Sequence, residues 1–289
     1  MEIFDYEGGI CKPAQELGVF LVPAVNGCSH NKCTFCCFYK HQTFGMIPLN
    51  EIEGELIRAK KHGAAVKRAM LVGGDPLALP VKDLMDINDL VRGYFPECGT
   101  ITMEASVQNL RRKTDEELII LRDAGYNDLY IGIESGMDSV LRHVKKGHTV
   151  AQAEEQLLRL NRLGIRHAAN LIFGIAGKGM GVENAKRTAE FLNKTKPFAI
   201  TIMALFLPSF VEMYQEIQRG EFVPADLDEM LLEERTLLDN LKLEGTRYDG
   251  SIYEPPVRLS GVLPKDLPRM YKKLGMAMEK YGGEIRDAV

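Results

Sequence analysis

The sequence lacks two patterns that would place a protein in or across a membrane. No apolar run approaches the roughly 18 residues that a membrane-spanning helix requires. The first residues, MEIFDYEGG, contain no basic segment followed by an apolar stretch, which is the pattern of a secretory signal. We therefore expect a cytoplasmic protein with no membrane partner, in which thiols stay reduced.

Cysteine is absent from the long part of the chain beyond Cys98. The other five of the six cysteines are Cys11, Cys28, Cys33, Cys36 and Cys37. A disulfide framework would link the whole chain, which this distribution does not allow, and reduced thiols argue against disulfides as well. The same absence argues against a second metal cluster held by cysteines.

An excess of positive charge is also missing. The chain has 36 Lys and Arg against 40 Asp and Glu, a formal net charge of −4, and a pI of about 5.9. Nucleic acid is therefore not an expected partner, although a local basic groove stays open. The densest basic stretch, RAKKHGAAVKR (58–68), has helical spacing, and its simpler interpretation is a solvated helix face.

The chain does contain a regular alternation of short apolar runs and segments with helical spacing. The apolar runs predict strands at 18–25, 67–74, 99–106, 128–136, 167–175 and 198–207. The helical segments lie at 49–63, 81–95, 114–125, 149–164 and 181–195. Such an alternation predicts an α/β fold with a parallel sheet, either open or curved into a partial barrel.

The rhythm changes after about residue 208. We expect residues 1–208 to form one domain and residues 209–289 to form a helical extension packed on it. Within the extension, we expect amphipathic helices at 210–222, 225–245 and 265–283, with an irregular or extended segment at 246–264 before the last of them.

The segments that follow the predicted strands carry most of the candidate chemistry. They are the cysteine loop, GGDP, EASVQN, IESG, FGIAGKG and LPSF. Active sites of parallel α/β folds form at the C-terminal ends of the strands. We therefore expect these segments to gather on one rim.

Four cysteines lie close together in NGCSHNKCTFCCFYKH (26–41), with the spacing Cys28-x4-Cys33-x2-Cys36. Zinc usually takes four ligands, often as two separated pairs, and no second Cys-x2-Cys pair follows. His30 and His41 would complete a zinc site. Three thiolates on one loop also suit a [4Fe–4S] cluster in which one iron keeps an open position. Both kinds of metal site stay open on the spacing alone.

The motifs together resemble the radical S-adenosylmethionine (SAM) superfamily. An aromatic residue precedes the third cysteine in CTFC, as is usual there, while the first gap is one residue longer than the usual Cys-x3-Cys-x2-Cys. LVGGDP, ITMEAS, YIGIESGMDSVLRHVKKGHT and ANLIFGIAG are similar to successive motifs of the branch that includes oxygen-independent coproporphyrinogen dehydrogenases and tRNA methylthiotransferases. The resemblance covers about residues 17–208 and implies a curved parallel (β/α)6 partial TIM barrel with a C-terminal helical extension.

The same resemblance implies an enzyme that uses SAM. In such enzymes a reduced [4Fe–4S] cluster cleaves SAM to methionine and a 5′-deoxyadenosyl radical, which abstracts hydrogen from a substrate. It implies Cys28, Cys33 and Cys36 as the cluster ligands. We expect Cys37 to point away, because adjacent residues cannot both face neighbouring irons without backbone strain.

The resemblance also assigns a set of residues to SAM binding. They are Phe35, Gly73, Gly74, Asp75, Glu104, Ser106, Glu134, Ser135, Lys146, Asn170, Gly174 and Ile175. Each also has a simpler interpretation as an ordinary turn, core or surface residue.

The expected roles within this set differ. Asp75 would accept a hydrogen bond from the SAM amino group, and Lys146 would lie near the SAM carboxylate. Asn170 would contact the ribose, Phe35 would pack near the adenine, and Gly174 and Ile175 would flank it. No general acid, base or radical-quenching residue is identified.

The expected partners are a small-molecule substrate and a low-potential electron donor such as ferredoxin or flavodoxin. No cobalamin-binding or RNA-binding domain fits in the length beyond the barrel, which favours the small molecule. The alternative hypothesis is a non-catalytic iron–sulfur or zinc-binding protein on a barrel scaffold. Such a protein has no need of Gly73, Gly74, Asp75, Glu134 and Lys146.

Overall fold

The computed structural model describes residues 18–252 and 257–281, which form two compact units. The first unit comprises the described residues up to Asn31 together with Phe38–Gly132 and Arg159–His167. The second unit comprises Lys32–Cys37, Ile133–Leu158 and the described residues from Ala168 onward. Within the described ranges, no helix combines the length and the apolar composition that crossing a membrane requires.

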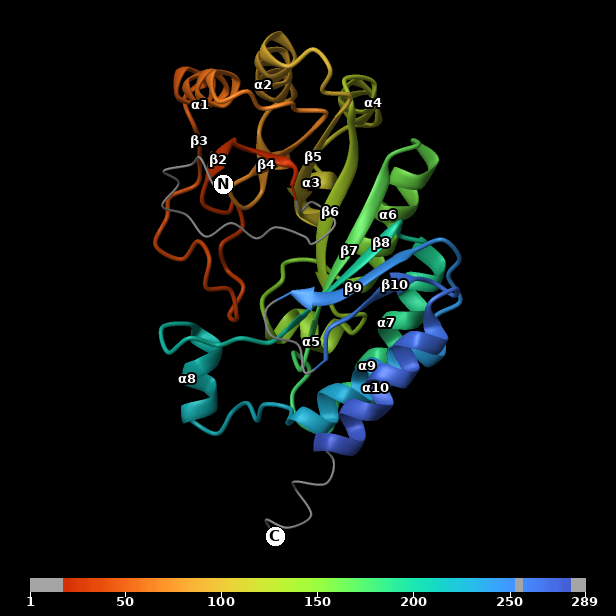
Figure 1. The fold of residues 1–289 in the computed structure, drawn as a ribbon. Coiled ribbons are helices and arrows are strands. Elements are labelled where there is room, and N and C mark those ends of the chain that lie inside the picture. The colour runs from red at the N-terminus through yellow and green to blue at the C-terminus, as the bar shows by residue number, and fades with distance from the viewer. Residues whose placement is uncertain (1–17, 253–256, 282–289) are drawn as a thin grey trace. The chain divides into compact units, whose positions relative to one another are not determined.

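The first unit is built on parallel strands with helices between them (Figure 1). Its strands are β1 (Phe20–Pro23), β4 (Arg68–Val72), β5 (Thr100–Ala105) and most of β6 (Tyr126–Glu134), and they pair in that order. The connections contain α1 (Leu49–Lys61), the 3₁₀ turn η2 (Pro76–Ala78), α2 (Val81–Tyr94), α3 (Val107–Leu110) and α4 (Asp115–Asp123). The short strands β2 (Val25–Asn26) and β3 (Gly45–Met46) pair antiparallel on either side of the cysteine segment in sequence.

The helices of the first unit bury one apolar stripe each. The stripes repeat every three or four residues, as the helical period requires, and consist of Ile52, Leu56 and Ala59 in α1 and Leu84, Ile87 and Val91 in α2. Burying one leucine or isoleucine side chain contributes roughly 1.5–3 kcal/mol. Packing of these stripes therefore holds the helices, more than their intrinsic propensity does.

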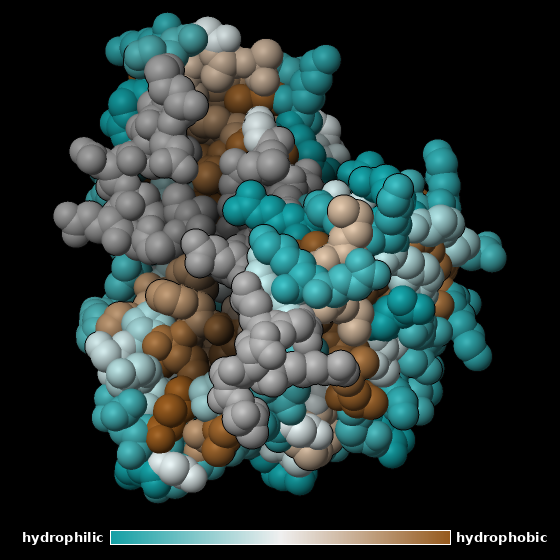
Figure 2. Space-filling view, turned by 60° about the horizontal axis from the view of Figure 1, so that its bottom comes forward, coloured by the Kyte–Doolittle hydropathy of each residue, from teal (hydrophilic) through white to brown (hydrophobic). Residues whose placement is uncertain are grey.

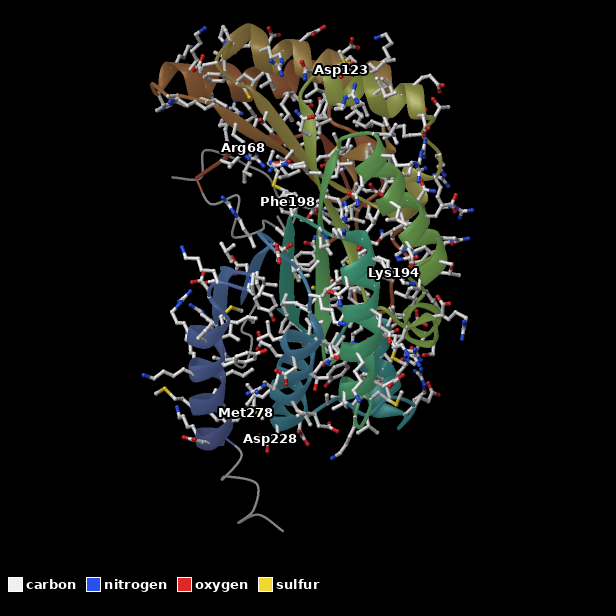
Figure 3. The ribbon with its side chains drawn as sticks, turned by 90° about the vertical axis from the view of Figure 1, so that its right-hand side faces the viewer. Arg68, Asp123, Lys194, Phe198, Asp228 and Met278 are labelled. Carbon is white, nitrogen blue, oxygen red and sulfur yellow. The ribbon has the colours of Figure 1, made fainter. Side chains whose placement is uncertain are left out.

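Within the first unit, a buried carboxylate links β6 to β4 and to the first residue of β7 (Arg166–Phe173). Asp128 of β6 is fully buried and accepts hydrogen bonds from Arg68 of β4, at 2.6 Å, and from Arg166, at 2.7 Å. Arg166 is that first residue of β7, and Arg68 is labelled in Figure 3. A buried charge that lost these partners would be strongly destabilising, so this cluster is structural.

The second unit contains a second run of strands. β7, β8 (Ala199–Ala204) and β9 (Arg247–Ile252) are parallel, and β10 (Leu259–Val262) pairs antiparallel with β9. Its helices are α5 (Asp138–His143), α6 (Val150–Arg162), α7 (Gly181–Thr195), α8 (Glu212–Gln218), α9 (Leu227–Asn240) and α10 (Leu267–Tyr281). The chain passes between the units at both ends of Lys32–Cys37 and within β6, α6 and β7.

Helices α7 and α9 pack side by side in the second unit and run in the same direction (Figure 3). Asp228 marks the start of α9 in that view, and Lys194 the end of α7. At the ends of the two helices, the Asn193 side chain donates a hydrogen bond to the Asn240 carbonyl at 2.9 Å. α10 packs on the same α9, so α9 is the central helix of this group.

Apolar side chains reach the surface in patches among hydrophilic ones, as Figure 2 shows for one face. Among the described residues, Phe206 is 65% exposed and Phe210 is 55% exposed. Phe206 directly precedes the segment LPSF that follows β8, and Phe210 is the last residue of that segment. Isolated exposed apolar side chains are normal on protein surfaces and carry no conclusion alone.

The predicted alternation is confirmed. Each of the six predicted strands and five predicted helices overlaps an observed one, whereas the short helices α3 and α5 were not expected. The extension is not wholly helical, because β9 and β10 form within the segment predicted as irregular or extended. The last residues of the predicted final helix, 282–283, lie outside the described residues. The compact units do not follow the boundary expected near residue 208, which stays a prediction.

Candidate functional site

Asp75 lies at the centre of a polar network in the first unit. The turn GGDP follows β4, and the Asp75 side chain is 1% exposed. Its Oδ2 accepts hydrogen bonds from Ser29 Oγ at 3.0 Å and from Asn109 Nδ2 at 2.6 Å. Asn109 also donates to Ser29 Oγ at 2.8 Å. The residue after Cys28 and the short helix α3 therefore both hold the Asp75 carboxylate in place.

The two glycines of the same turn adopt backbone angles that disfavour other residues. φ is +123° at Gly73 and +117° at Gly74. A Cβ on Gly74 would lie 2.6 Å from the carbonyl oxygen of Gly27. The need for glycine at position 74 is thus explained by a contact with the cysteine segment. A role of either glycine toward a ligand stays a prediction.

Glu104 and Ser106 occupy the end of β5 and the residue after it. Both side chains are half-buried, with the buried Ala105 between them, so they share one facing parity. The Ser106 hydroxyl accepts a hydrogen bond from the Asn109 backbone N–H at 3.2 Å and so caps α3. Ser106 therefore has a structural role as the cap of α3, in addition to its predicted role in SAM binding.

The predicted cluster ligands are cysteines that fall on both compact units. Cys28 belongs to the first unit, and Cys33 and Cys36 belong to the second. All three are half-buried and form no disulfide. Over the described parts of the chain, no three His, Cys, Asp or Glu residues are gathered as a metal site.

The cysteine segment of the second unit is anchored through the residues between its cysteines. The Thr34 backbone N–H donates to the Val144 carbonyl at 3.1 Å, and the Thr34 carbonyl accepts a hydrogen bond from the Met213 N–H at 3.0 Å. Phe35 packs against a buried apolar cluster that includes Val140, Ile172 and Ile175. Phe35 and Ile175, both predicted near the adenine, are therefore brought to one cluster. Burial raises the pKa of the neighbouring Cys37 thiol.

Glu134 combines several unusual features at the end of β6. Its backbone is left-handed, with φ of +65°, which is rare for a residue with a side chain and often occurs at functional sites. The residue is 6% exposed, and its Oε1 accepts a hydrogen bond from Lys146 Nζ at 2.6 Å. Its buried Oε2 has no hydrogen-bond partner among the described residues. This oxygen is an acceptor left available inside a protected pair.

A second buried network connects Ser135 with the segment after β7. Ser135 Oγ donates to Asn184 Oδ1 at 2.5 Å, and Asn184 Nδ2 donates to Glu233 Oε1 at 2.7 Å. Glu233 Oε2 accepts the Gly174 backbone N–H at 2.8 Å. Burial raises the pKa of Glu233 to about 7, opposed by the hydrogen bonds from Asn184 and Gly174. The network brings together Ser135 and Gly174, two of the predicted SAM-binding positions.

Asn170 and Ile175 complete the predicted set in the second unit. Asn170 lies within β7, is 7% exposed, and its Oδ1 has no hydrogen-bond partner in the described chain. Ile175 lines a cavity of about 410 Å³, together with Val140, His143, Lys178 and Phe222. An unpartnered amide oxygen and an apolar wall are features that a nucleoside ligand can use.

Four polar residues of these networks were not identified from the sequence. They are Ser29, Asn109, Asn184 and Glu233. For Glu233 a signal was present, because it stands four residues before the buried Leu237 in an amphipathic helix, where an apolar residue is expected. For Ser29 and the two asparagines the local sequence gives no such signal.

Comparison with known proteins shows what this chain is similar to. The profile of the radical SAM superfamily matches residues 22–192. Heme chaperone HemW of Bacillus subtilis is 24% identical over 200 residues, covering 67% of this chain and 52% of HemW. A tRNA-2-methylthio-N(6)-dimethylallyladenosine synthase of Neisseria meningitidis is 26% identical over 204 residues, covering 67% of this chain and 44% of that protein.

A solved structure shows the same fold. Coproporphyrinogen III oxidase (HemN) from Escherichia coli matches with a TM-score of 0.58 at 18% sequence identity, covering 76% of this chain and 50% of HemN. The chain thus spans about half the length of these relatives. The α/β partial-barrel fold class predicted from the sequence is confirmed, and so is the branch that the motifs resembled. Since the superfamily profile covers more than half of the chain, the protein belongs to the radical SAM superfamily.

Proposed function

We propose that the protein is a radical SAM enzyme that binds a [4Fe–4S] cluster through Cys28, Cys33 and Cys36. When bound, the reduced cluster supplies the electron that cleaves SAM to methionine and a 5′-deoxyadenosyl radical, which takes hydrogen from the substrate. Membership of the superfamily supports this proposal. The observation that carries it is Glu134, a strained and buried acid with one oxygen on Lys146 and the other left as an acceptor.

The chemistry of the residues fits both groups. Three cysteines that form no disulfide match a cluster in which one iron keeps a position for SAM. The amino and carboxylate groups of SAM carry opposite charges, and this chain offers both complements. Asp75 and Glu134 would accept hydrogen bonds from the ammonium, and Lys146 would neutralise the carboxylate.

The chain's own residues would then orient SAM and exclude water. Ser29 and Asn109 hold the Asp75 carboxylate in one direction. Asn170, buried in β7, would accept a hydrogen bond from a ribose hydroxyl, and Ile175 and Phe35 would give the adenine an apolar contact. The other proposed SAM-binding positions are Gly73, Gly74, Glu104, Ser106, Ser135 and Gly174.

The proposed partners are a small-molecule substrate and a low-potential donor such as ferredoxin or flavodoxin, in the cytoplasm. One relative is named for a tRNA modification. This chain has a net charge of −4 and therefore lacks the overall positive charge that is typical of nucleic-acid-binding proteins. Because the chain spans about half of the relatives' length, we do not infer its substrate from theirs.

Anaerobic reconstitution tests the proposal. Iron and sulfide are added to the protein, cluster content is measured by iron analysis and the visible spectrum, and SAM and dithionite follow. We expect 5′-deoxyadenosine and methionine in the wild type and a strong loss of both with Cys36→Ser. A fully loaded cluster that binds SAM without cleaving it would favour the non-catalytic carrier. Stoichiometric zinc in place of iron would favour the zinc-binding alternative.

A further inference from the structure

Glu233 is a buried acid of the C-terminal extension, outside the region matched by the superfamily profile. It lies on α9 and is fully buried. Both of its carboxylate oxygens accept hydrogen bonds, one from the Gly174 N–H at 2.8 Å and one from Asn184 at 2.7 Å. A buried carboxylate that accepts two good hydrogen bonds fixes the groups that donate them.

The segment after β7 lies against α9 at several points. A Cβ on Gly174 would lie 3.2 Å from Met230 Sδ, and a Cβ on Gly181 would lie 3.2 Å from Cβ of Glu233. Gly179 donates its backbone N–H to Glu229 Oε1 at 2.6 Å. The absence of side chains at these glycines lets the segment approach the helix closely, so α9 sets its position.

Glu233 also reaches the turn after β6. Asn184 of α7 bridges from Glu233 to the Ser135 hydroxyl, and Ser135 Oγ in turn accepts the Met137 N–H at 3.0 Å. One carboxylate therefore orders two separate segments, at Gly174 and at Ser135. Figure 3 shows the two helices that carry the bridge, α7 and α9, side by side.

We propose that Glu233 is a positioning residue for SAM binding, acting from the extension on Gly174 directly and on Ser135 through Asn184. The inference rests on the proposed function, in which Gly174 and Ser135 contact SAM. In this proposal the extension contributes to the SAM site through Glu233, a residue outside the region that the superfamily profile matches.

The chemistry of the contact suggests a discriminating set of variants. Glu233→Gln keeps the size of the side chain but turns an NH₂ group toward one of two donors, so one hydrogen bond is lost. Adding Asn184→Asp restores the pattern, because the new carboxylate accepts from both the introduced amide NH₂ and Ser135 Oγ. Glu234→Gln is the matched control, since Glu234 is the adjacent buried acid and accepts a hydrogen bond from the Tyr248 hydroxyl at 2.8 Å.

Two measurements are made on each variant. Hydrogen–deuterium exchange on the cluster-free protein reports how firmly the Gly174 amide is held. On the reconstituted protein, calorimetric titration gives the SAM dissociation constant, and 5′-deoxyadenosine formation gives KM and kcat. For Glu233→Gln we expect about tenfold faster exchange and about tenfold weaker SAM binding. KM for SAM should rise, while kcat at saturating SAM stays within about twofold.

The outcomes separate this inference from the proposed function. Recovery of SAM affinity in the Glu233→Gln, Asn184→Asp double variant, with wild-type behaviour of Glu234→Gln, supports it. Wild-type SAM affinity in Glu233→Gln overturns it and leaves the proposed function intact. If Glu233→Gln fails to fold, a folded double variant that still binds SAM weakly overturns it as well. A cluster-loaded wild type that does not bind SAM overturns both.

Discussion

The ammonium group of Lys146 lies 2.6 Å from Oε1 of Glu134, and both side chains are largely withdrawn from water. Lys145, the residue before, pairs instead with the exposed Glu212 at 2.6 Å. Two adjacent lysines thus have different environments, one in a protected pair and one at the surface. This contrast provides a matched test of the proposed SAM site.

Glu134→Ala and Lys146→Ala should each weaken SAM binding. Loss of one charge-assisted hydrogen bond is worth about 1.5–3 kcal/mol, which corresponds to roughly 10- to 150-fold in the dissociation constant. Lys145→Ala should change the constant by less than about twofold, because exposed ion pairs contribute little. Titration of the reconstituted variants with SAM gives the three values. Equal effects of the two lysines would contradict the assignment of Lys146.

Asn109→Ala should weaken SAM binding and lower stability together. The Asp75 carboxylate loses its 2.6 Å donor and keeps the 3.0 Å bond from Ser29. We expect a loss of about 1–3 kcal/mol in the free energy of unfolding, measured with urea, since a buried charge is left less satisfied. Arg112→Ala is the control, because the side chain of this exposed residue donates to the other end of the Asn109 amide, Oδ1, at 3.2 Å. An Asn109→Ala protein as stable as the wild type would refute a holding role.

Cys37→Ser should retain the cluster and the activity, whereas Cys36→Ser should lose much of both. Cys36 stands at the third position of the Cys-x4-Cys-x2-Cys motif, directly after Phe35, which packs in the apolar cluster of the second unit. Adjacent residues cannot both turn toward one cluster without strain between them. Iron content per chain after reconstitution distinguishes the two variants. The reverse result would mean that the ligand register is shifted by one residue.

The buried Glu234 predicts a pH dependence of stability. Burial raises its pKa from 4.5 to about 8, opposed by the hydrogen bond from Tyr248. Between these values the folded state keeps a proton that the unfolded state has released, so the free energy of unfolding falls as pH rises. Its contribution is fully present below pH 4.5 and is lost as pH rises through about 8.

Glu234→Gln removes this proton, so its free energy of unfolding should fall less steeply with pH than that of the wild type. Urea unfolding at several pH values between about 5 and 8 measures the two slopes. Glu190→Gln, at an exposed residue whose carboxylate lies 3.4 Å from Arg187, should keep the wild-type slope. Parallel curves for wild type and Glu234→Gln would show that Glu234 is ionised in the folded state.

The secondary structure was largely predictable because it depends on local periodicity. The apolar runs that predict β4 and β7, and the apolar stripe that predicts α1, each lie within one short stretch of sequence. α3, with residues Val107–Leu110, is too short to show a period. β9 is extended in sequence, but its addition beside β8 depends on a partner far away in the chain.

The candidate site was predictable only where a motif marks it. Glu134 and Lys146 were predicted from their place in such a motif, and the structure brings the two side chains into contact. Their role in binding SAM stays a prediction. The partners of Asp75 and Gly174 were missed, because Asn109 and Glu233 are 34 and 59 residues away in sequence. Hydrogen bonds between distant segments leave no local pattern in the sequence. Residues that hold the site residues in place are therefore not predictable from the sequence alone.

The pairing of β9 with β8 has a consequence for anyone who wishes to shorten this protein. Ala199 and Ile200 of β8 stand in register with Arg247 and Tyr248 of β9, so a strand of the extension covers that side of β8. A chain ending at residue 208 would leave the backbone N–H and C=O groups of this apolar strand open to other molecules. Uncovered strand edges recruit strands from neighbouring chains. The shortened protein should therefore aggregate even where its own motifs are complete.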